Sequence, residues 1–384
     1  MPSDKHAYIV GAWEHPTRNA PDKSVMQLQA ECVAGALADA GLGKDDVDAY
    51  FCAGDAPGLG PLSIVDFLNL KVRFAESTDI GGAAPLQHIA HAAQAIAAGK
   101  CNVAVVTLAG RSRNGWRDPE LDPRQPDQLW ENPLWRMTPD IYALCARRHM
   151  HEFGTTSEQL AWIKVAASHH AQHNPRAMLR KVVTVEDVLA SPMVSDPLHR
   201  FDCCVVSDGG GAVIVTRPEI AKSLKRPLVK VVGSGEGIQG QSAGAVELTA
   251  SSARQSGAMA FAEAGVKPSD IQYASIYDSF TITVLIALED LGFCEKGQGG
   301  RFVADGNLIS GVGRLPFNTD GGGLCNNHPA GRGGITKVIE AVRQLRGEAH
   351  PAVQVKDCAL ALAHGTGMLL GTRHATATLI MERE

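Results

Sequence analysis

The stretches ALADAGLGKDDV, residues 36–47, and AFAEAGVKPSDI, residues 260–271, decide the fold, because they match almost position by position. Each begins as a helical pattern and reaches a glycine of the kind that closes helices in the left-handed conformation. An acidic turn follows, and then a short apolar run typical of a strand. Two copies of one helix-turn-strand unit predict a duplicated fold.

A second matched pair follows in the same order. The helical pattern AAQAIAAGK from Ala92 ends at Gly99, and EAVRQLRGE from Glu340 ends at Gly347. Strand-like runs lie between the helical ones: YIVGAW, VAVVTLAG and GAVIVT in the first half, and VKVVGSGEG and TATLIM in the second. Because strands that alternate with helices are usually joined by crossovers, we expect an α/β protein with mainly parallel sheets.

The repeat divides the chain into an N-terminal half, residues 1–225, and a C-terminal half, residues 226–384. Residues from about 113 to 200 interrupt the first half with prolines, charged residues and two helical patterns, which indicates a long excursion over the active face. If a pseudo-twofold axis relates the halves, the loops around Gly82 and His328 face one another. The sequence therefore predicts one shared site at the join.

Composition and charge exclude several classes of protein. With 45% hydrophobic residues and 40 glycines, the 384-residue chain has the composition of a globular α/β protein. Its net charge of -5 offers no basic field for nucleic acid, and no run of 18 apolar residues predicts a membrane span. The first residues do not read as a signal peptide, so we expect a cytoplasmic protein. Nine cysteines without a CxxC pair indicate reduced thiols and no structural zinc site.

A series of short motifs points to a family. In chain order they are Met-His, Phe-Gly-Thr, Asn-Pro, Cys-Cys and Ser-Asp-Gly, beginning at residues 150, 153, 174, 203 and 207. With the loops around Gly82 and His328, this order resembles the thiolase superfamily, specifically its sterol-carrier-protein and lipid-transfer branch, over nearly the whole chain. The resemblance implies a duplicated thiolase fold with five layers, α-β-α-β-α.

Three catalytic motifs define that branch, and the chain departs from the first and keeps most of the third. Where a CxS motif opens a buried helix, the chain has Gly82, or Ala83 with a one-residue slip, so the acyl-enzyme of thiolases cannot form there. The late GHP motif survives as Asn327, His328 and a proline. By resemblance, His328 helps to hold the thioester oxygen and to stabilise an enolate.

The second motif, HDCF in the branch, reads YDSF in this chain. Tyr277 replaces the histidine, Asp278 is retained and Ser279 replaces the acid/base cysteine. The sequence is similar to lipid-transfer-type aldolases of steroid side-chain breakdown, which have tyrosines at the positions of this histidine and of the late histidine. Retro-aldol cleavage of a β-hydroxyacyl-CoA needs an enolate and a proton shuttle but no nucleophile, so these residues favour it.

In this reading Tyr277 removes the β-hydroxyl proton. Because the pKa of a phenol is near ~10, a cation or hydrogen bonds from His328 or His364 are expected to lower it. Asp278 is expected to point away from Tyr277 and to hold neighbouring backbone, with direct catalysis as the alternative. The run HGTGM, residues 364–368, is expected to form a glycine-rich loop whose amides, at Gly365 and Gly367, make an oxyanion or thioester pocket.

Structural alternatives accompany these roles. Tyr277 could fill a core position, His328 could cap the following helix, and Cys325 could be a displaced nucleophile or acid, or else a small buried hydrophobic residue. The histidines in HHAQH, residues 169–173, lack a third ligand nearby, so no metal site is predicted. The glycines at 81 and 82 lack the spacing of a dinucleotide fingerprint.

The leading hypothesis is a carbon-carbon lyase acting on an acyl-CoA in lipid or steroid-type catabolism, with coenzyme A as part of the substrate and no tightly bound cofactor. The alternatives are an acyltransferase with another nucleophile and a non-catalytic acyl-CoA-binding or scaffold subunit. The resemblance also implies a small partner with a zinc ribbon and an OB-fold. It further implies a homodimer paired through a sheet edge, for which VAVVTLAG at 103–110 is the candidate.

Overall fold

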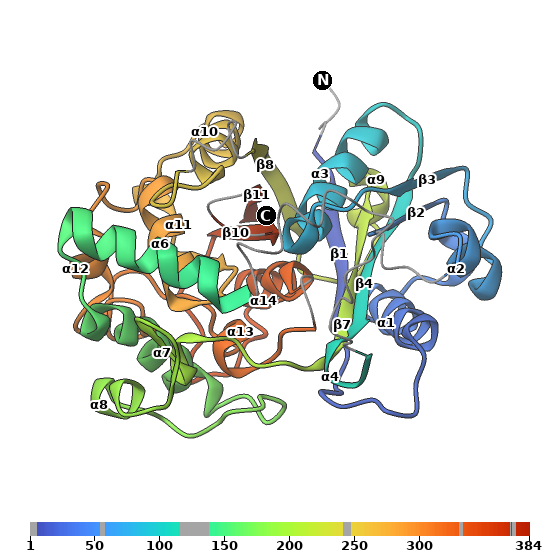
Figure 1. Cartoon of the computed structure of the whole chain (residues 1–384). Coiled ribbons are helices and arrows are strands. Elements are labelled where there is room, and N and C mark those ends of the chain that lie inside the picture. Colours follow the sequence, from blue (N-terminus) through green and yellow to red (C-terminus); the bar gives the residue numbers. More distant parts are fainter. Residues whose placement is uncertain are drawn as a thin grey trace.

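A computed structural model describes residues 6–53, 58–115, 138–240, 247–329, 333–368, 370 and 374–384. Its main feature is a sheet of nine strands in the order β3-β2-β4-β7-β1-β8-β11-β10-β9 (Figure 1). A short hairpin of β5 and β6 pairs separately. The strands are β1 (Tyr8–Glu14), β2 (Ala49–Cys52), β3 (Phe74–Ser77), β4 (Val103–Arg111), β5 (Met193–Ser195), β6 (Leu198–His199), β7 (Asp208–Thr216), β8 (Val229–Gln239), β9 (Tyr273–Ile276), β10 (Leu360–Met368) and β11 (His374–Arg383).

Helices of very different lengths connect and cover these strands. The described helices are α1 (Val25–Ala40), α2 (Pro61–Leu68), α3 (Ala84–Ala97), α4 (Ser112–Gly115), α6 (Thr138–Phe153), α7 (Ser157–Ala171), α8 (Val185–Leu189), α9 (Pro218–Ala221), α10 (Ala253–Ala264), α11 (Thr281–Asp290), α12 (Gly299–Val303), α13 (Gly322–Cys325) and α14 (Gly334–Arg346). Short 3-10 turns are η1 (Lys44–Asp46), η2 (Gly81–Ala83), η3 (Arg200–Asp202) and η5 (Pro268–Asp270).

The strand order confirms the predicted duplication. Outward from the middle of the sheet, the strands of the first half have the order β1-β7-β4-β2. Those of the second half have the order β8-β11-β10-β9, so each strand of one half has a counterpart at the same place in the other. The matched helices α1 and α10 both end at left-handed glycines, Gly41 with φ of 71° and Gly265 with φ of 68°. The two copies join where β1 pairs antiparallel with β8, with Ile9 opposite Val229. The predicted boundary at residues 225 and 226 falls between β7 and β8, and a division into separate domains there stays a prediction.

The prediction of mainly parallel sheets is wrong. Among the described strands, β2 runs parallel to β3 and β4, and β9 runs parallel to β10, whereas the other neighbours in the main sheet are antiparallel. Parallel neighbours need a long crossover. The connection from β10 to β11 is too short for one, and β4 reaches its neighbour β7 through the excursion.

The strand proposed for dimer pairing is also corrected. VAVVTLAG forms most of β4, which lies between β2 and β7 and is therefore hydrogen-bonded on both sides. Continuous burial along an apolar run is typical of a central strand. At the first-half end of the sheet the edge strand is β3, whose side chains alternate between half-buried and exposed.

Two helices form the centre of the molecule. α3 and α14 contact strands of both halves and contact each other, while α1 covers the outer side of the first half and α10 the outer side of the second. Figure 1 shows α14 between the two sets of strands. Nearly every residue of α14 is buried, as expected for a helix with sheet on both sides. The layers therefore follow the order α-β-α-β-α that the resemblance implied.

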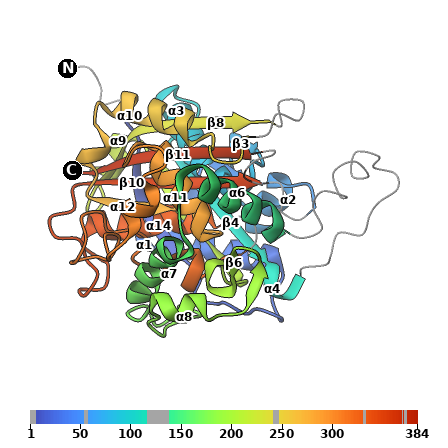
Figure 2. The ribbon, with the colours of Figure 1, turned by 60° about the vertical axis from the view of Figure 1, so that its left-hand side comes forward.

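The excursion inserted in the first half covers the second half. α6 and α7 correspond to the two helical patterns expected there, and they contact α11, while α7 also contacts α12 and α13. Figure 1 shows α6, α7 and α8 on the side of α11 and α12, away from α1, and Figure 2 shows α6 beside α11 with α7 and α8 at the lower edge of the view. Within the described part of the chain, no helix is long and apolar enough to cross a membrane.

Candidate active site

Three loops from distant parts of the sequence meet beside α3 and α14. The turn η2 carries Gly82, the chain leaving β9 carries Tyr277, and the loop after α13 carries His328. The Tyr277 hydroxyl lies 2.8 Å from Nε2 of His328, and the two rings meet edge to face with centroids 5.4 Å apart. A Cβ atom added to Gly82 would lie 2.5 Å from Cε2 of Tyr277. The structure thus brings the three motifs of the sequence together.

The place of the thiolase nucleophile is filled. A Cβ atom at Gly82 would meet the carbonyl oxygen of Thr366 at 2.4 Å as well as the Tyr277 ring. Ala83 is fully buried and packs in a hydrophobic cluster between the halves. Neither position therefore offers a nucleophilic side chain, and the Tyr277 ring occupies the space in front of Gly82.

Burial keeps both members of the Tyr277–His328 pair uncharged. Burial raises the pKa of Tyr277 well above 10, and negative charge on Cys204 or Tyr142 would raise it further. Dense packing around the partly exposed His328 lowers its pKa to about 4, and the cation of Lys337 adds to this effect. The two groups share one hydrogen bond, which the phenol donates when the neutral imidazole carries its proton on Nδ1. The expectation that a cation or hydrogen bonds of a histidine bring the pKa of Tyr277 below 10 is therefore wrong.

The side chain of Asp278 holds α13, the short helix that precedes His328, in place. Its carboxylate accepts hydrogen bonds from the backbone N–H groups of Gly323 at 2.8 Å and Leu324 at 3.1 Å, in the first turn of α13. Nζ of Lys337 on α14 lies 2.9 Å from the same carboxylate, and both side chains are buried. These contacts agree with the expectation that Asp278 holds neighbouring backbone.

The run HGTGM is part of strand β10 and not a loop, which corrects the sequence prediction. Gly365 and Gly367 face η2 and the residue before it, because a Cβ atom at Gly365 would lie 2.9 Å from Cα of Ala83 and one at Gly367 would meet the carbonyl of Ile80. They are paired with Ala377 and Ala375 of β11. The two glycines thus permit close packing of β10 against η2, and the glycine-rich composition misled the loop prediction.

His364 lies on the opposite face of β10 from these glycines, because successive side chains alternate along a strand. Its Nδ1 lies 2.9 Å from Oγ1 of Thr378. Burial lowers its pKa to about 3, with a further effect from His374, so the imidazole is neutral. Only its backbone carbonyl reaches toward the site, accepting a 2.9 Å hydrogen bond from the N–H of Tyr277. The structure does not bring the His364 side chain to Tyr277.

Cys325 and Asn327 flank the start of the His328 loop. Cys325 is fully buried in a hydrophobic cluster; burial raises the pKa of its thiol, although Lys164 opposes that rise. The side-chain N–H of Asn327 donates to the carboxylate of Glu14. The N–H of His328 itself donates to the hydroxyl of Ser207 at 3.0 Å. Within the described residues, no group of three or more potential metal ligands gathers.

Comparisons with known proteins place this geometry in a family. A family model described as thiolase C-terminal domain-like matches residues 235–383. The chain is 34% identical to the 17-hydroxy-3-oxo-4-pregnene-20-carboxyl-CoA lyase of Mycobacterium tuberculosis, over 95% of this chain and 99% of that protein. The chain belongs to the thiolase superfamily. Its lipid-transfer branch is also confirmed, because the chain is 36% identical to the steroid side-chain-cleaving aldolase of Thermomonospora curvata, over 88% and 89% of the two chains.

A solved structure agrees with this membership. The structure described as an Ltp2-ChsH2(DUF35) aldolase superimposes with a TM-score of 0.88 at 32% identity and covers 99% of this chain and 98% of that one. The fold expected from the sequence is thereby confirmed for this thiolase-superfamily protein.

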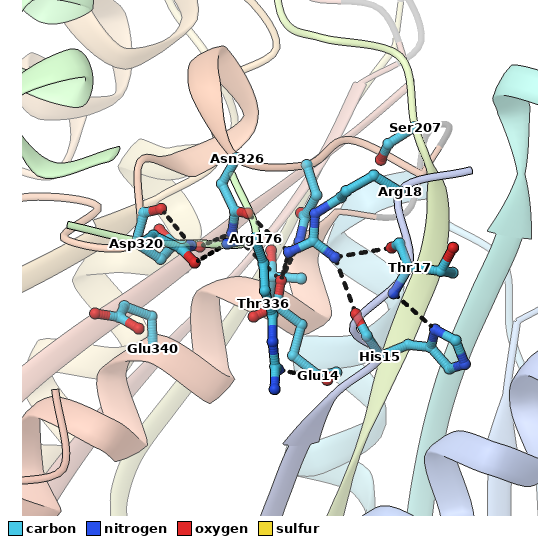
Figure 3. Close-up of polar contacts among 12 residues, drawn as sticks. Glu14, His15, Thr17, Arg18, Arg176, Ser207, Asp320, Asn326, Thr336 and Glu340 are labelled. Carbon is cyan, nitrogen blue, oxygen red and sulfur yellow. Dashed lines mark hydrogen bonds and ion pairs between the residues drawn. The ribbon is translucent and has the colours of Figure 1, made fainter. Parts of the chain in front are cut away.

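Several residues of the site escaped the sequence analysis. Tyr142 on α6 is buried and stacks on Phe280 of the YDSF motif, with centroids 4.2 Å apart. Glu14, at the end of β1, contacts the loop that carries His328. Figure 3 shows the polar cluster around Glu14. Tyr142 lies in the excursion, where no motif marks it, and the burial of Glu14 depends on a junction between halves that sequence spacing does not show.

A cavity lies beside the YDSF motif and α13 in this thiolase-superfamily chain, and neither Tyr277 nor His328 is among its described lining residues. Its volume is about 700 Å³, and residues 203–206 form one wall. The same segment is hydrogen-bonded along the site: the N–H of Cys204 to the carbonyl of Ser279 at 2.9 Å, and the N–H of Val205 to the carbonyl of Gly323 at 2.9 Å. The lining is mostly apolar and includes Met178, Leu179, Pro192, Phe201 and Val206, with the charged residues Asp187 and Arg200 beside them.

Proposed function

We propose that this protein is an acyl-CoA carbon-carbon lyase that cleaves a β-hydroxyacyl-CoA by a retro-aldol reaction. The observation that carries the proposal is the hydrogen bond of 2.8 Å between the neutral Tyr277 and His328, beside a Gly82 that has no room for a nucleophile. The names of the two relatives, a steroid side-chain-cleaving aldolase and a carboxyl-CoA lyase, support the same reaction class. They also support a steroid-like acyl group.

The pair supplies a route for the proton. As the oxygen of Tyr277 accepts the proton of the substrate's β-hydroxyl, its own proton passes to Nε2 of His328. The β-carbon becomes a carbonyl, the bond between the α- and β-carbons breaks, and its electron pair forms the enolate of the shortened thioester. The proton then returns through Tyr277 to the α-carbon. The products are an aldehyde or ketone and an acyl-CoA.

Backbone groups are proposed to hold the thioester. Gly82 and Ala83 lie in η2, directly before α3, where backbone N–H groups favour developing negative charge. Asn327 is proposed to line the site beside His328, and Cys325 to support it from the core. Asp278 is proposed to act by holding α13 in place. Gly365 and Gly367 are proposed to keep η2 close to β10.

The acyl-CoA itself is proposed to lie along the segment 203–206. The cavity of about 700 Å³ has a size suited to a small-molecule ligand, and Arg200 in its lining offers a cation for a phosphorylated substrate. Coenzyme A enters and leaves as part of the substrate and product. The route needs no tightly bound cofactor, since the chain's own groups move the proton.

Assembly is part of the proposal. The solved relative is named with a DUF35 component, which supports a small partner with a zinc ribbon and an OB-fold for this chain. A homodimer is proposed through the edge of β3, beside which Leu62 and Phe67 of α2 are largely exposed. The thiols of Cys32, Cys203 and Cys325 are among those that form no disulfide, which supports a cytoplasmic location because reducing compartments keep thiols free.

A panel of β-hydroxyacyl-CoA and β-ketoacyl-CoA esters of increasing bulk tests the function. The protein is incubated with each ester, with and without its small partner, and the products are followed by mass. Release of an aldehyde or ketone from the hydroxy esters is expected. CoA-dependent cleavage of the keto esters would instead indicate an acyltransferase, and tight binding without turnover would indicate a scaffold subunit.

A further inference from the structure

A buried carboxylate from the first half contacts the loop that carries His328. Glu14 ends β1 and is 2% exposed. It accepts hydrogen bonds from the guanidinium groups of Arg18 at 2.6 Å and Arg343 at 3.2 Å. It also accepts from the side-chain amides of Asn326 at 3.3 Å and of Asn327. One carboxylate therefore joins the first half, the His328 loop and α14.

Asn326 and Asn327 immediately precede His328, so their positions determine where its imidazole can lie. The amide of Asn326 is held on both sides, because its oxygen accepts from Arg18 at 2.7 Å and its nitrogen donates to Asp320 at 2.9 Å. Figure 3 shows Arg18 and Asn326 gathered near Glu14. The backbone of the loop is then tied to Ser207 through the N–H of His328.

The charge on Glu14 is needed for this arrangement. Burial would raise the pKa of Glu14, but the cations of Arg18 and Arg343 outweigh that effect and hold its pKa below the usual range. An ionised carboxylate accepts from several donors at once, whereas a neutral amide at the same place has one accepting oxygen. Arg18 and Arg343 would also lose their shared counter-charge.

We propose that Glu14 is a positioning residue for His328. Through Asn326 and Asn327 it fixes the loop so that Nε2 of the imidazole stays within hydrogen-bonding distance of the Tyr277 hydroxyl. It does not touch the substrate. The proposal rests on the proposed function, because the Tyr277–His328 pair is the proton route of that reaction. A misplacement of about 1 Å at such a pair is enough to slow a reaction about 100-fold.

Substitution of Glu14→Gln tests the proposal. Because the substituted residue contacts no substrate, kcat is expected to fall about 10- to 100-fold while KM changes less than about threefold. A crystal structure of the variant is expected to show the distance from the Tyr277 hydroxyl to Nε2 of His328 beyond hydrogen-bonding range. Glu31→Gln is the matched control, because this half-exposed carboxylate on α1 pairs with His15 and Lys23. It is expected to keep the rate and the distance.

The outcomes separate this proposal from the function on which it rests. A folded Glu14→Gln variant with unchanged kcat and an intact Tyr277–His328 hydrogen bond overturns the positioning role, and a rise in KM alone would indicate substrate contact instead. If Glu14→Gln does not fold, Asn326→Ala removes one tether between Glu14 and the loop without leaving unpaired charge, and the same fall in kcat is expected. If the unaltered protein cleaves no ester, the proposed lyase function is wrong. Crystal structures of the unaltered protein and the Glu14→Gln variant would still show whether Glu14 sets the distance between the Tyr277 hydroxyl and Nε2 of His328.

Discussion

Gly82 and Tyr277 fit each other as a pair. The missing side chain at Gly82 leaves the space that the Tyr277 ring fills, and the carbonyl of Thr366 closes that space from β10. Two departures from the family motifs therefore depend on each other: tyrosine replaces the histidine at position 277, and glycine replaces the nucleophile at position 82. The phenol is buried, uncharged and hydrogen-bonded to His328, which suits transfer of a proton and not attack on a thioester.

Gly82→Ala is expected to destabilise the protein. The added methyl group would meet both a backbone oxygen and an aromatic ring at about 2.5 Å or less, and overpacking of this kind costs about 1–3 kcal/mol. Urea unfolding followed by circular dichroism measures the change. Gly240→Ala is the control, since a Cβ atom there has nothing within 4 Å. Equal unfolding midpoints for the two variants would show that the space around Gly82 is not restricted.

At the scale of elements, the four-residue helix α13 is held at both ends. Asp278 accepts from N–H groups in its first turn, and Nζ of Lys164 on α7 donates to the carbonyl of Leu324 at 2.7 Å near its last residue. Charges of these signs at these ends also complement the helix dipole. A helix this short is not stable alone, so its position before His328 depends on these buried contacts.

Asp278→Asn is expected to lower the free energy of unfolding by about 3–5 kcal/mol, because Lys337 would be left buried without its counter-charge. Denaturant unfolding measures the loss. Glu219→Gln is the comparison, since its pairing with Arg217 is exposed and such pairs contribute little. A loss no larger than that of Glu219→Gln would mean that Asp278 does not hold α13.

The sequence predicted those elements whose signals are local. The helices closed by Gly41 and Gly265 and the apolar run of β4 were predicted correctly, because capping and periodicity depend on neighbours in the chain. The sequence did not predict that residues 364–368 form a strand, that most strand pairs are antiparallel, or that β4 lies inside the sheet. These depend on packing against distant segments, as Gly367 against Ile80 shows.

The candidate site was predicted in part, for the same reason. The meeting of Gly82, Tyr277 and His328 followed from the repeat and the motifs, since both place the loops at one junction. The protonation states of Tyr277 and His328 could not be predicted from the sequence, because they depend on burial and burial is a property of the fold. Glu14 and Tyr142 carry no motif that marks them as part of the site.

At the scale of the whole molecule, the duplicated fold packs two halves around α3 and α14, buries several histidines and packs densely around the partly exposed His328. Burial lowers the pKa of each to about 3 or 4, well below the value of about 6.5 for a histidine in an unfolded chain. Each therefore binds a proton more readily when the protein unfolds. They are His88, His170, His328, His364 and His374.

Stability is therefore expected to fall in mild acid. Below about pH 6.5 the unfolded chain takes up protons that the folded protein does not, so the free energy of unfolding decreases until the pH reaches about 4. Each histidine contributes up to about 1.4 kcal/mol per pH unit. Glu340, whose pKa burial raises to about 7, opposes this trend. The midpoints of urea unfolding at pH 7.5 and pH 5.5 measure the combined effect of these groups on stability. Equal midpoints would contradict the expected loss of stability in mild acid.

The single-turnover rate of Tyr277→Phe on a β-hydroxyacyl-CoA cleaved by the unaltered protein tests the central claim most directly. The substitution keeps the ring that packs against Gly82 and removes only the hydroxyl that is hydrogen-bonded to His328. If the pair moves the proton, the rate falls about 100- to 10,000-fold while the fold and substrate binding persist. A variant that cleaves the ester at the unaltered rate would contradict the proposed proton route through Tyr277 and His328.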